Sequence, residues 1–110
     1  MNSYTVDQTH WATLSIFEQM GNIYSEVGRS FKAKEQGDTI GSQAAVERAI
    51  DLFDATVDSL VTSKSPRVKE VLRAKEQYLA TINNMNADLT SIQSLDRYFM
   101  QFAIAARLNR

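Results

Sequence analysis

Apolar side chains recur at three- and four-residue steps in four separate stretches of this 110-residue chain. In the first two stretches the recurring residues are Ile16, Phe17, Met20, Ile23, Tyr24, Val27 and Phe31, followed by Val46, Ile50, Phe53, Val57, Leu60 and Val61. In the last two they are Val68, Val71, Leu72, Tyr78, Leu79 and Ile82, followed by Ile92, Leu95, Tyr98, Phe99, Phe102 and Ala106. Residues at these steps share one face of a helix. The pattern therefore predicts four amphipathic helices and an all-α protein.

Capping residues indicate where the first two helices begin and end. The first helix is predicted to open between Thr5 and Asp7, since Thr5 and Gln8 fit a capping box and Asp7 is an alternative cap. It is predicted to end at Gly37, after about 30 residues or roughly 45 Å. The second helix follows Asp38 or Ser42 and ends near Thr62.

The third helix is predicted to begin at Ser65 and Pro66, with the serine as cap and the proline in the first turn. The asparagine-rich stretch 83–88 ends it, and Thr90 with Gln93 offers a capping box for the last helix. Four such helices with short loops predict a four-helix bundle with a long first helix and up-and-down topology, forming a single domain over residues 1–110. In the first helix, Gly21 and Gly28 indicate either a close approach of another helix or a break.

Composition excludes several classes of function. Cysteine is absent, so disulfides, thiolate metal sites and a cysteine nucleophile are excluded. No apolar run approaches 18 residues and no signal-peptide pattern occurs, so we expect no membrane association and a cytoplasmic location. The net charge of −1 argues against nucleic acid as a partner. No motif indicates a cofactor, and a single histidine, His10, cannot supply the paired Glu-x-x-His of di-iron bundles.

Four carboxylates line one stripe of the second helix at steps of four, three and four residues: Glu47, Asp51, Asp54 and Asp58. Such a row could hold a divalent cation, as in all-helical nucleotide pyrophosphatases, which this chain resembles only loosely. The paired Glu-x-x-Glu and Glu-x-x-Asp of those enzymes are not found. We therefore favour a solvated acidic face and predict no metal site, with the acidic row as the weaker alternative.

Lys75 stands within the apolar stripe of the third helix, four residues after Val71 and four before Leu79. Either its stem lies across the edge of the core while the ammonium reaches water, or the ammonium is buried and pairs with Glu47 or Asp51.

The same helix is locally basic, because Arg67, Lys69 and Arg73 accompany Lys75. This cluster indicates either a phosphate or RNA contact or a balance of charge against the acidic second helix.

The face of the first helix opposite its apolar stripe carries Asn22, Ser25, Glu26 and Arg29. Such residues are ordinarily exposed, and Glu26 could pair with Arg29 at three-residue spacing.

Met100 and Ile104 lie away from the main stripe of the last helix. They are either scattered surface residues or a contact with another chain. The first helix is also longer than the last, so part of its apolar face would need cover from a second subunit, which favours a homodimer.

Several segments together resemble a group of short bacterial helical proteins of unknown function. These are residues 22–29 with Lys32 and Gly37–Asp38, residues 47–49, residues 67–73, and the closing segment Tyr98 to Arg107, which is the most specific. The resemblance spans roughly residues 14–107. It implies a bacterial, cytoplasmic protein and gives no activity or ligand.

The resemblance also singles out polar residues of the shared segments as candidate binding residues: Asn22, Ser25, Glu26, Arg29 and Arg107. In the third helix the group leads us to expect an arginine where this chain has Lys75, and lysine serves a bidentate partner less well.

Two hypotheses follow from the sequence. The first is a non-enzymatic protein-interaction module, expected to form a homodimer, that binds another protein through the polar face of the first helix or the tail of the last. The alternative is a metal- or nucleotide-binding helical-bundle enzyme that uses the acidic row with Arg73 or Lys75.

Overall fold

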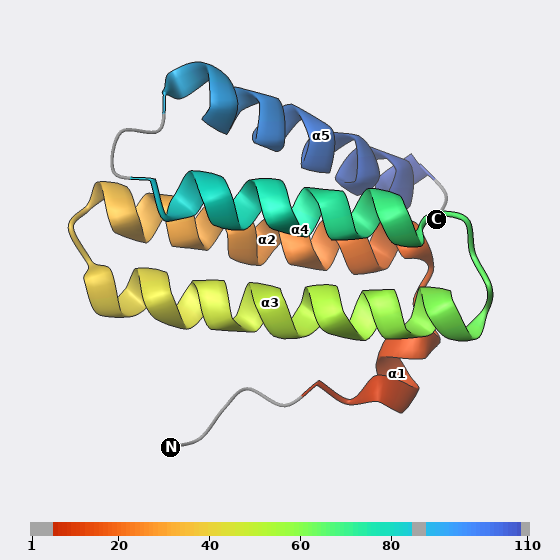
Figure 1. The fold of residues 1–110 in the computed structure, drawn as a ribbon. Helices are drawn as coiled ribbons and strands as arrows, with labels where there is room; N and C mark the ends of the chain where they lie inside the picture. The colour runs from red at the N-terminus through yellow and green to blue at the C-terminus, as the bar shows by residue number, and fades with distance from the viewer. Residues whose placement is uncertain (1–5, 85–87, 109–110) are drawn as a thin grey trace.

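The described residues, 6–84 and 88–108 of a computed structural model, form five α-helices and no strand. The helices are α1 (Gln8–Ala12), α2 (Ile16–Glu35), α3 (Thr39–Thr62), α4 (Val68–Ile82) and α5 (Leu89–Leu108). The all-α prediction is confirmed. α3 lies beside both α2 and α4, and α5 packs chiefly against α2 (Figure 1). The radius of gyration is 13.8 Å, close to the value of about 13 Å for a compact domain of this length. None of these helices combines the length and apolar character that crossing a membrane requires.

The predicted long first helix is wrong, because the chain turns sharply after α1. Ser15 begins α2 with a capping box, in which the Ser15 hydroxyl accepts from the Glu18 amide at 3.1 Å and the Glu18 carboxylate accepts from the Ser15 amide at 3.1 Å. These bonds satisfy amides that a continuous helix would pair internally. Of the two predicted caps, Asp7 does cap α1, its carboxylate accepting from the His10 amide at 3.2 Å; Thr5 lies outside the described residues.

The helix breaks at neither glycine. A Cβ placed on Gly21 would lie 3.8 Å from the Cα of Ala103, whereas nothing lies within 4 Å of one on Gly28. Gly21 therefore marks a close approach of α2 to α5, and Gly28 faces open space.

Short α1 folds back onto α3. The Trp11 indole donates to the Thr56 hydroxyl at 3.0 Å, and the Gln8 amide donates to the Ala55 carbonyl at 3.1 Å. The side-chain amide of Gln19 in α2 donates to the Trp11 carbonyl at 2.9 Å. These bonds hold α1 against the α2–α3 pair.

α2 and α3 are joined by a Schellman motif that leads directly into a helix cap. Gly37 has a φ of 75°, its amide donates to the Lys34 carbonyl, and the Asp38 amide donates to the Ala33 carbonyl. The Asp38 carboxylate then accepts from the Gly41 amide and begins α3, as predicted. The far end of α3 closes in the same way, but with Lys64 in the left-handed position at a φ of 57°.

The predicted starts of the last two helices are displaced. α4 begins at Val68 after Arg67, and the Ser65 hydroxyl accepts from the Arg67 amide at 3.2 Å in the turn before it. At α5 the Asp88 carboxylate, rather than Thr90, takes the capping role by accepting from the Ser91 amide at 2.7 Å. This bond holds the pKa of Asp88 below its ordinary value.

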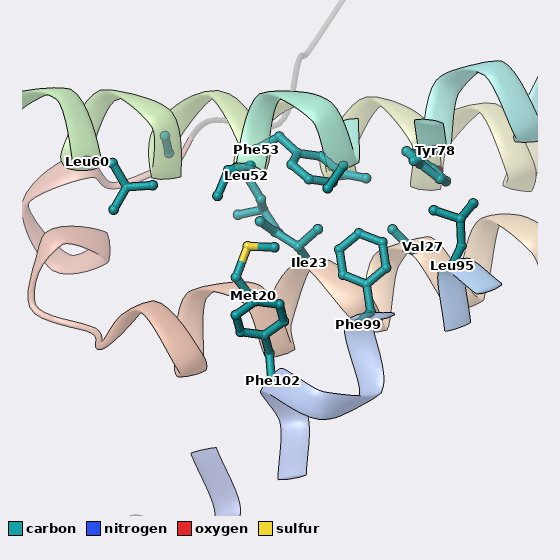
Figure 2. Close-up of a cluster of buried hydrophobic side chains, with 14 of the residues drawn as sticks. Met20, Ile23, Val27, Leu52, Phe53, Leu60, Tyr78, Leu95, Phe99 and Phe102 are labelled. Atoms are coloured by element: carbon teal, nitrogen blue, oxygen red, sulfur yellow. The ribbon is translucent and has the colours of Figure 1, made fainter. Parts of the chain in front are cut away.

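The core lies where the four long helices meet (Figure 2). Its fully buried members include Met20 and Ile23 from α2, Phe53 from α3, Tyr78 from α4 and Phe99 from α5.

Two predicted core residues, Val61 and Leu72, are exposed by 56% and 40%. α3 instead buries small residues, Ala45, Ala49 and Ala55. Small side chains allow neighbouring helices to approach closely, and the most extensive contact of α3 is with α2.

We predict opposite effects from glycine exchange at the two ends of α3. Gly37→Ala should lower the free energy of unfolding by about 1–2 kcal/mol, because a Cβ disfavours positive φ. Lys64→Gly should raise it by about 0.5 kcal/mol, since relief of the same strain exceeds the added freedom of the unfolded chain. Urea unfolding followed by circular dichroism measures both. Gly28→Ala, in open helical space, is the control and should stabilise by up to about 1 kcal/mol; an unchanged Gly37→Ala variant would contradict the assignment.

Candidate functional site

Of the charged residues in the described ranges, only Glu26 is buried, with 7% of its surface exposed. Its carboxylate binds two arginines: Arg29 Nη1 lies 2.8 Å from one oxygen, and Arg48 Nε lies 2.7 Å from the other. The predicted Glu26–Arg29 pair is confirmed. The predicted position of Glu26 on the solvent face of its helix is wrong, because the side chain lies at the junction with α3.

Two opposed effects act on the Glu26 carboxyl. Burial by itself would raise its pKa, but the hydrogen bonds and charges of Arg29 and Arg48 outweigh burial and hold the pKa below its ordinary value. The carboxylate is therefore ionised at neutral pH and links α2 to α3 through Arg48. Sequence reasoning did not assign Arg48 a role, because its distance from Glu26 depends on how the two helices are aligned.

Asn22 and Ser25 lie exposed on α2, and both make local bonds. The Asn22 amide donates to the Glu18 carbonyl at 3.0 Å, and the Ser25 hydroxyl donates to the Gly21 carbonyl at 3.3 Å. The polar residues that the sequence singled out on this helix are thus engaged with their own helix or with Arg48.

Asn22 lies near a second candidate residue, Arg107. Both line an open pocket of about 380 Å³ between α2 and α5, together with Glu18, Gly21, Ala103 and Ala106. The pocket does not include Ser25, Glu26 or Arg29. Arg107 forms no ion pair within residues 6–84 and 88–108.

α5 presents a row of apolar side chains to the outside. Met100, Ile104 and Leu108 follow at steps of four residues and are exposed by 42%, 47% and 78%. The opposite side of α5 buries Phe99 and Phe102. Sequence reasoning singled out Met100 and Ile104 but missed Leu108, although the four-residue step continued to it.

We define the outer face of α5 by six exposed residues: Asp96, Arg97, Met100, Ile104, Arg107 and Leu108. The remaining large apolar residues with comparable exposure in the described chain, Ile40, Val61, Leu72 and Leu89, lie on other helices or at the opposite end of α5. Single exposed apolar residues are ordinary, whereas a contiguous row bordered by charges is typical of an interaction surface.

Lys75 pairs with neither Glu47 nor Asp51, but with Asp54. Its ammonium lies 2.7 Å from the Asp54 carboxylate, and the two side chains are exposed by 24% and 58%. This contact agrees with the prediction that the stem lies on the core edge while the ammonium reaches the surface. Arg73, exposed on the same helix, forms no ion pair among the described residues.

The acidic row of α3 does not assemble into a metal site. Within the described residues, no group of three or more histidine, cysteine, aspartate or glutamate side chains is placed to hold a metal ion. Burial, followed by the charges of Asp54 and Glu47, raises the pKa of Asp51, because each of these effects disfavours the ionised carboxylate.

We predict that Glu26→Gln lowers the free energy of unfolding at neutral pH by about 1–3 kcal/mol, because two charge-assisted hydrogen bonds are lost. A folded-state pKa below that of the unfolded chain gives stability that is present above the unfolded value and is lost as pH falls through the folded one. The gap between wild type and variant should therefore narrow below about pH 4.5, the ordinary glutamate pKa. Denaturant unfolding over a pH series measures it. Exposed Glu76→Gln is the matched control, and a gap that does not change with pH would refute the ionic link.

Lys75→Met should change the free energy of unfolding by less than about 1 kcal/mol, in either direction, because the Lys75–Asp54 pair is partly exposed. Thermal and urea unfolding provide the measurement. A loss of several kcal/mol would show instead that the ammonium holds Asp54 in a buried polar site.

Comparison of the chain with protein-family models, with curated proteins and with solved structures finds no match. The functional conclusion therefore depends on the residues and their geometry.

Proposed function

We propose that this protein is a non-enzymatic interaction module that binds another protein through the outer face of α5. The observation that carries the proposal is the row of exposed apolar side chains, Met100, Ile104 and Leu108, next to the charged residues Asp96 and Arg107. An apolar row with a charged border combines the two features that protein interfaces use for affinity and for orientation.

The state of the other candidate residues supports this choice over an enzyme. The Glu26 carboxylate is occupied by two arginines and the Lys75 ammonium by Asp54. These groups join neighbouring helices, so their charges serve the scaffold.

We further propose that α2, α3, α4 and α5 form an up-and-down four-helix bundle, with α1 as an added cover. The contacts of α2 with α3 and α5, and of α3 with α4, support this topology, as do the short connections between successive helices. A bacterial origin and a cytoplasmic location also remain proposals, supported by the resemblance and by the absence of cysteine.

The test compares the double variant Met100→Lys/Ile104→Lys with the control Leu72→Lys, whose parent side chain is exposed to nearly the same degree as Met100. Partners captured from the native host by the wild type are identified by mass spectrometry, purified and titrated against all three proteins. We expect the double variant to lose at least about tenfold in affinity, because apolar contact is replaced by buried charge, and the control to bind as the wild type does.

Equal affinity of the double variant and the control would refute the proposal. So would a melting temperature raised by Mg²⁺, Mn²⁺ or a nucleotide, because a ligand that binds only the native state must stabilise it, and such a ligand would favour the enzyme hypothesis.

A further inference from the structure

We infer that the outer face of α5 binds a second copy of this chain, with the two α5 helices antiparallel about a two-fold axis. The inference rests on the proposed function and names the partner. The observation that carries it is the order of four residues along α5: Asp96 precedes Met100 and Ile104, and Arg107 follows them.

The apolar and charged pairs share nearly one centre along the helix. Asp96 lies four residues before Met100, and Arg107 lies three residues after Ile104. A two-fold axis across α5 between Met100 and Ile104 therefore places Met100 opposite Ile104 of the partner subunit and Asp96 opposite Arg107 of the partner subunit. Each contact occurs twice, as an isologous interface requires.

Asp96 and Arg107 also lie on the same flank of α5, as the antiparallel pairing requires. At 3.6 residues per turn, Asp96 and Arg107 fall within about 20° of each other around the axis of α5. In an antiparallel pair related by this axis, the same flank of each helix meets, so the carboxylate and the guanidinium face each other. Asp96 is the only acidic residue of α5, and a parallel pair would leave Arg107 without an acidic residue of α5 at its level.

The structure holds Asp96 in position for this contact. The Tyr24 hydroxyl donates to one oxygen of the Asp96 carboxylate at 2.6 Å, and this bond, followed by burial and the carboxylate charge, raises the pKa of Tyr24 to about 12. No hydrogen bond within the described residues uses the second carboxylate oxygen. Asp96 thus presents a fixed acceptor at the surface.

The size of the surface sets the strength expected. A contact made by one helix per subunit covers less than the roughly 800 Å² per partner of a typical stable interface. We therefore expect a weak dimer, with a dissociation constant in the micromolar range, rather than an obligate one.

The first test is a charge swap followed by analytical ultracentrifugation over a micromolar concentration series. Arg107→Asp should weaken dimerisation by about tenfold or more, since it places two carboxylates opposite each other on both sides of the axis. The double variant Asp96→Arg/Arg107→Asp should recover affinity to within about threefold of wild type, because the pairs are restored with their signs exchanged. Melting curves establish that each variant is folded, and Leu72→Lys should dimerise as the wild type does.

The second test uses the absence of cysteine from the chain. Met100→Cys and Ile104→Cys are made separately and mixed under mild oxidation. The antiparallel arrangement predicts that the disulfide between positions 100 and 104 of different subunits forms faster than either symmetric disulfide. Symmetric disulfides formed in preference, or a charge swap that restores nothing, would overturn the inference.

The outcomes separate the partner from the function. A wild-type protein that stays monomeric throughout the series, yet binds a foreign protein through Met100 and Ile104, overturns the second copy and leaves the proposed function standing. A dimer that survives Met100→Lys/Ile104→Lys overturns the inferred interface, and unchanged binding of foreign partners by that variant would overturn the proposed function as well.

Discussion

The contact on which the rest of the helical packing depends is the burial of the Phe53 ring. From α3, this ring reaches Tyr78 of α4 and Phe99 of α5, with centroids 6.2 Å and 6.0 Å away. Aromatic residues of α2 pack on those same two rings: Phe31 lies 5.9 Å from Tyr78, and Tyr24 lies 6.2 Å from Phe99. The Phe53 side chain therefore joins three successive helices, α3, α4 and α5, and α2 packs on the same aromatic group. Offset and edge-on aromatic pairs add direction to a burial that would otherwise have none.

Polar groups make this apolar arrangement specific. The Tyr78 hydroxyl is carried into the core and donates to the Ser30 hydroxyl at 2.7 Å, while Ser30 donates to the Val27 carbonyl. In the described residues no buried side-chain nitrogen or oxygen lacks a partner. Rotation of a helix would leave these buried groups without hydrogen bonds. The free energy lost would then exceed that of the lost apolar contact alone. The hydrogen bonds of Glu26 with Arg29 and Arg48 impose the same constraint at the α2–α3 junction. The exposed apolar residues of α5, Met100, Ile104 and Leu108, lie outside this core.

The sequence predicted the all-helical character of the fold and its long helices. Helical spacing located every long helix, and Asp7, Gly37 and Asp38 marked ends correctly because caps and left-handed turns depend on local chemistry. The break before α2 was missed although Ser15 and Glu18 form a readable capping box, because Leu14, Ile16 and Phe17 continue the apolar spacing across it. The partner of Lys75 and the burial of Glu26 depend on the rotation of one helix against another, which no local pattern contains. Met100 and Ile104 could be singled out because their spacing alone places them outside the core.

The docking of α1 has a consequence for observing this molecule. Trp11 is the only tryptophan of the chain. It belongs to the five-residue α1, and its buried indole donates to the Thr56 hydroxyl of α3. Its fluorescence therefore senses whether α1 is seated, whereas far-ultraviolet dichroism senses the four long helices. A short helix held by a few hydrogen bonds belongs to the low-stability end of a fold. The two optical signals thus separate the detachment of α1 from α3 from the unfolding of the whole domain, without any added label.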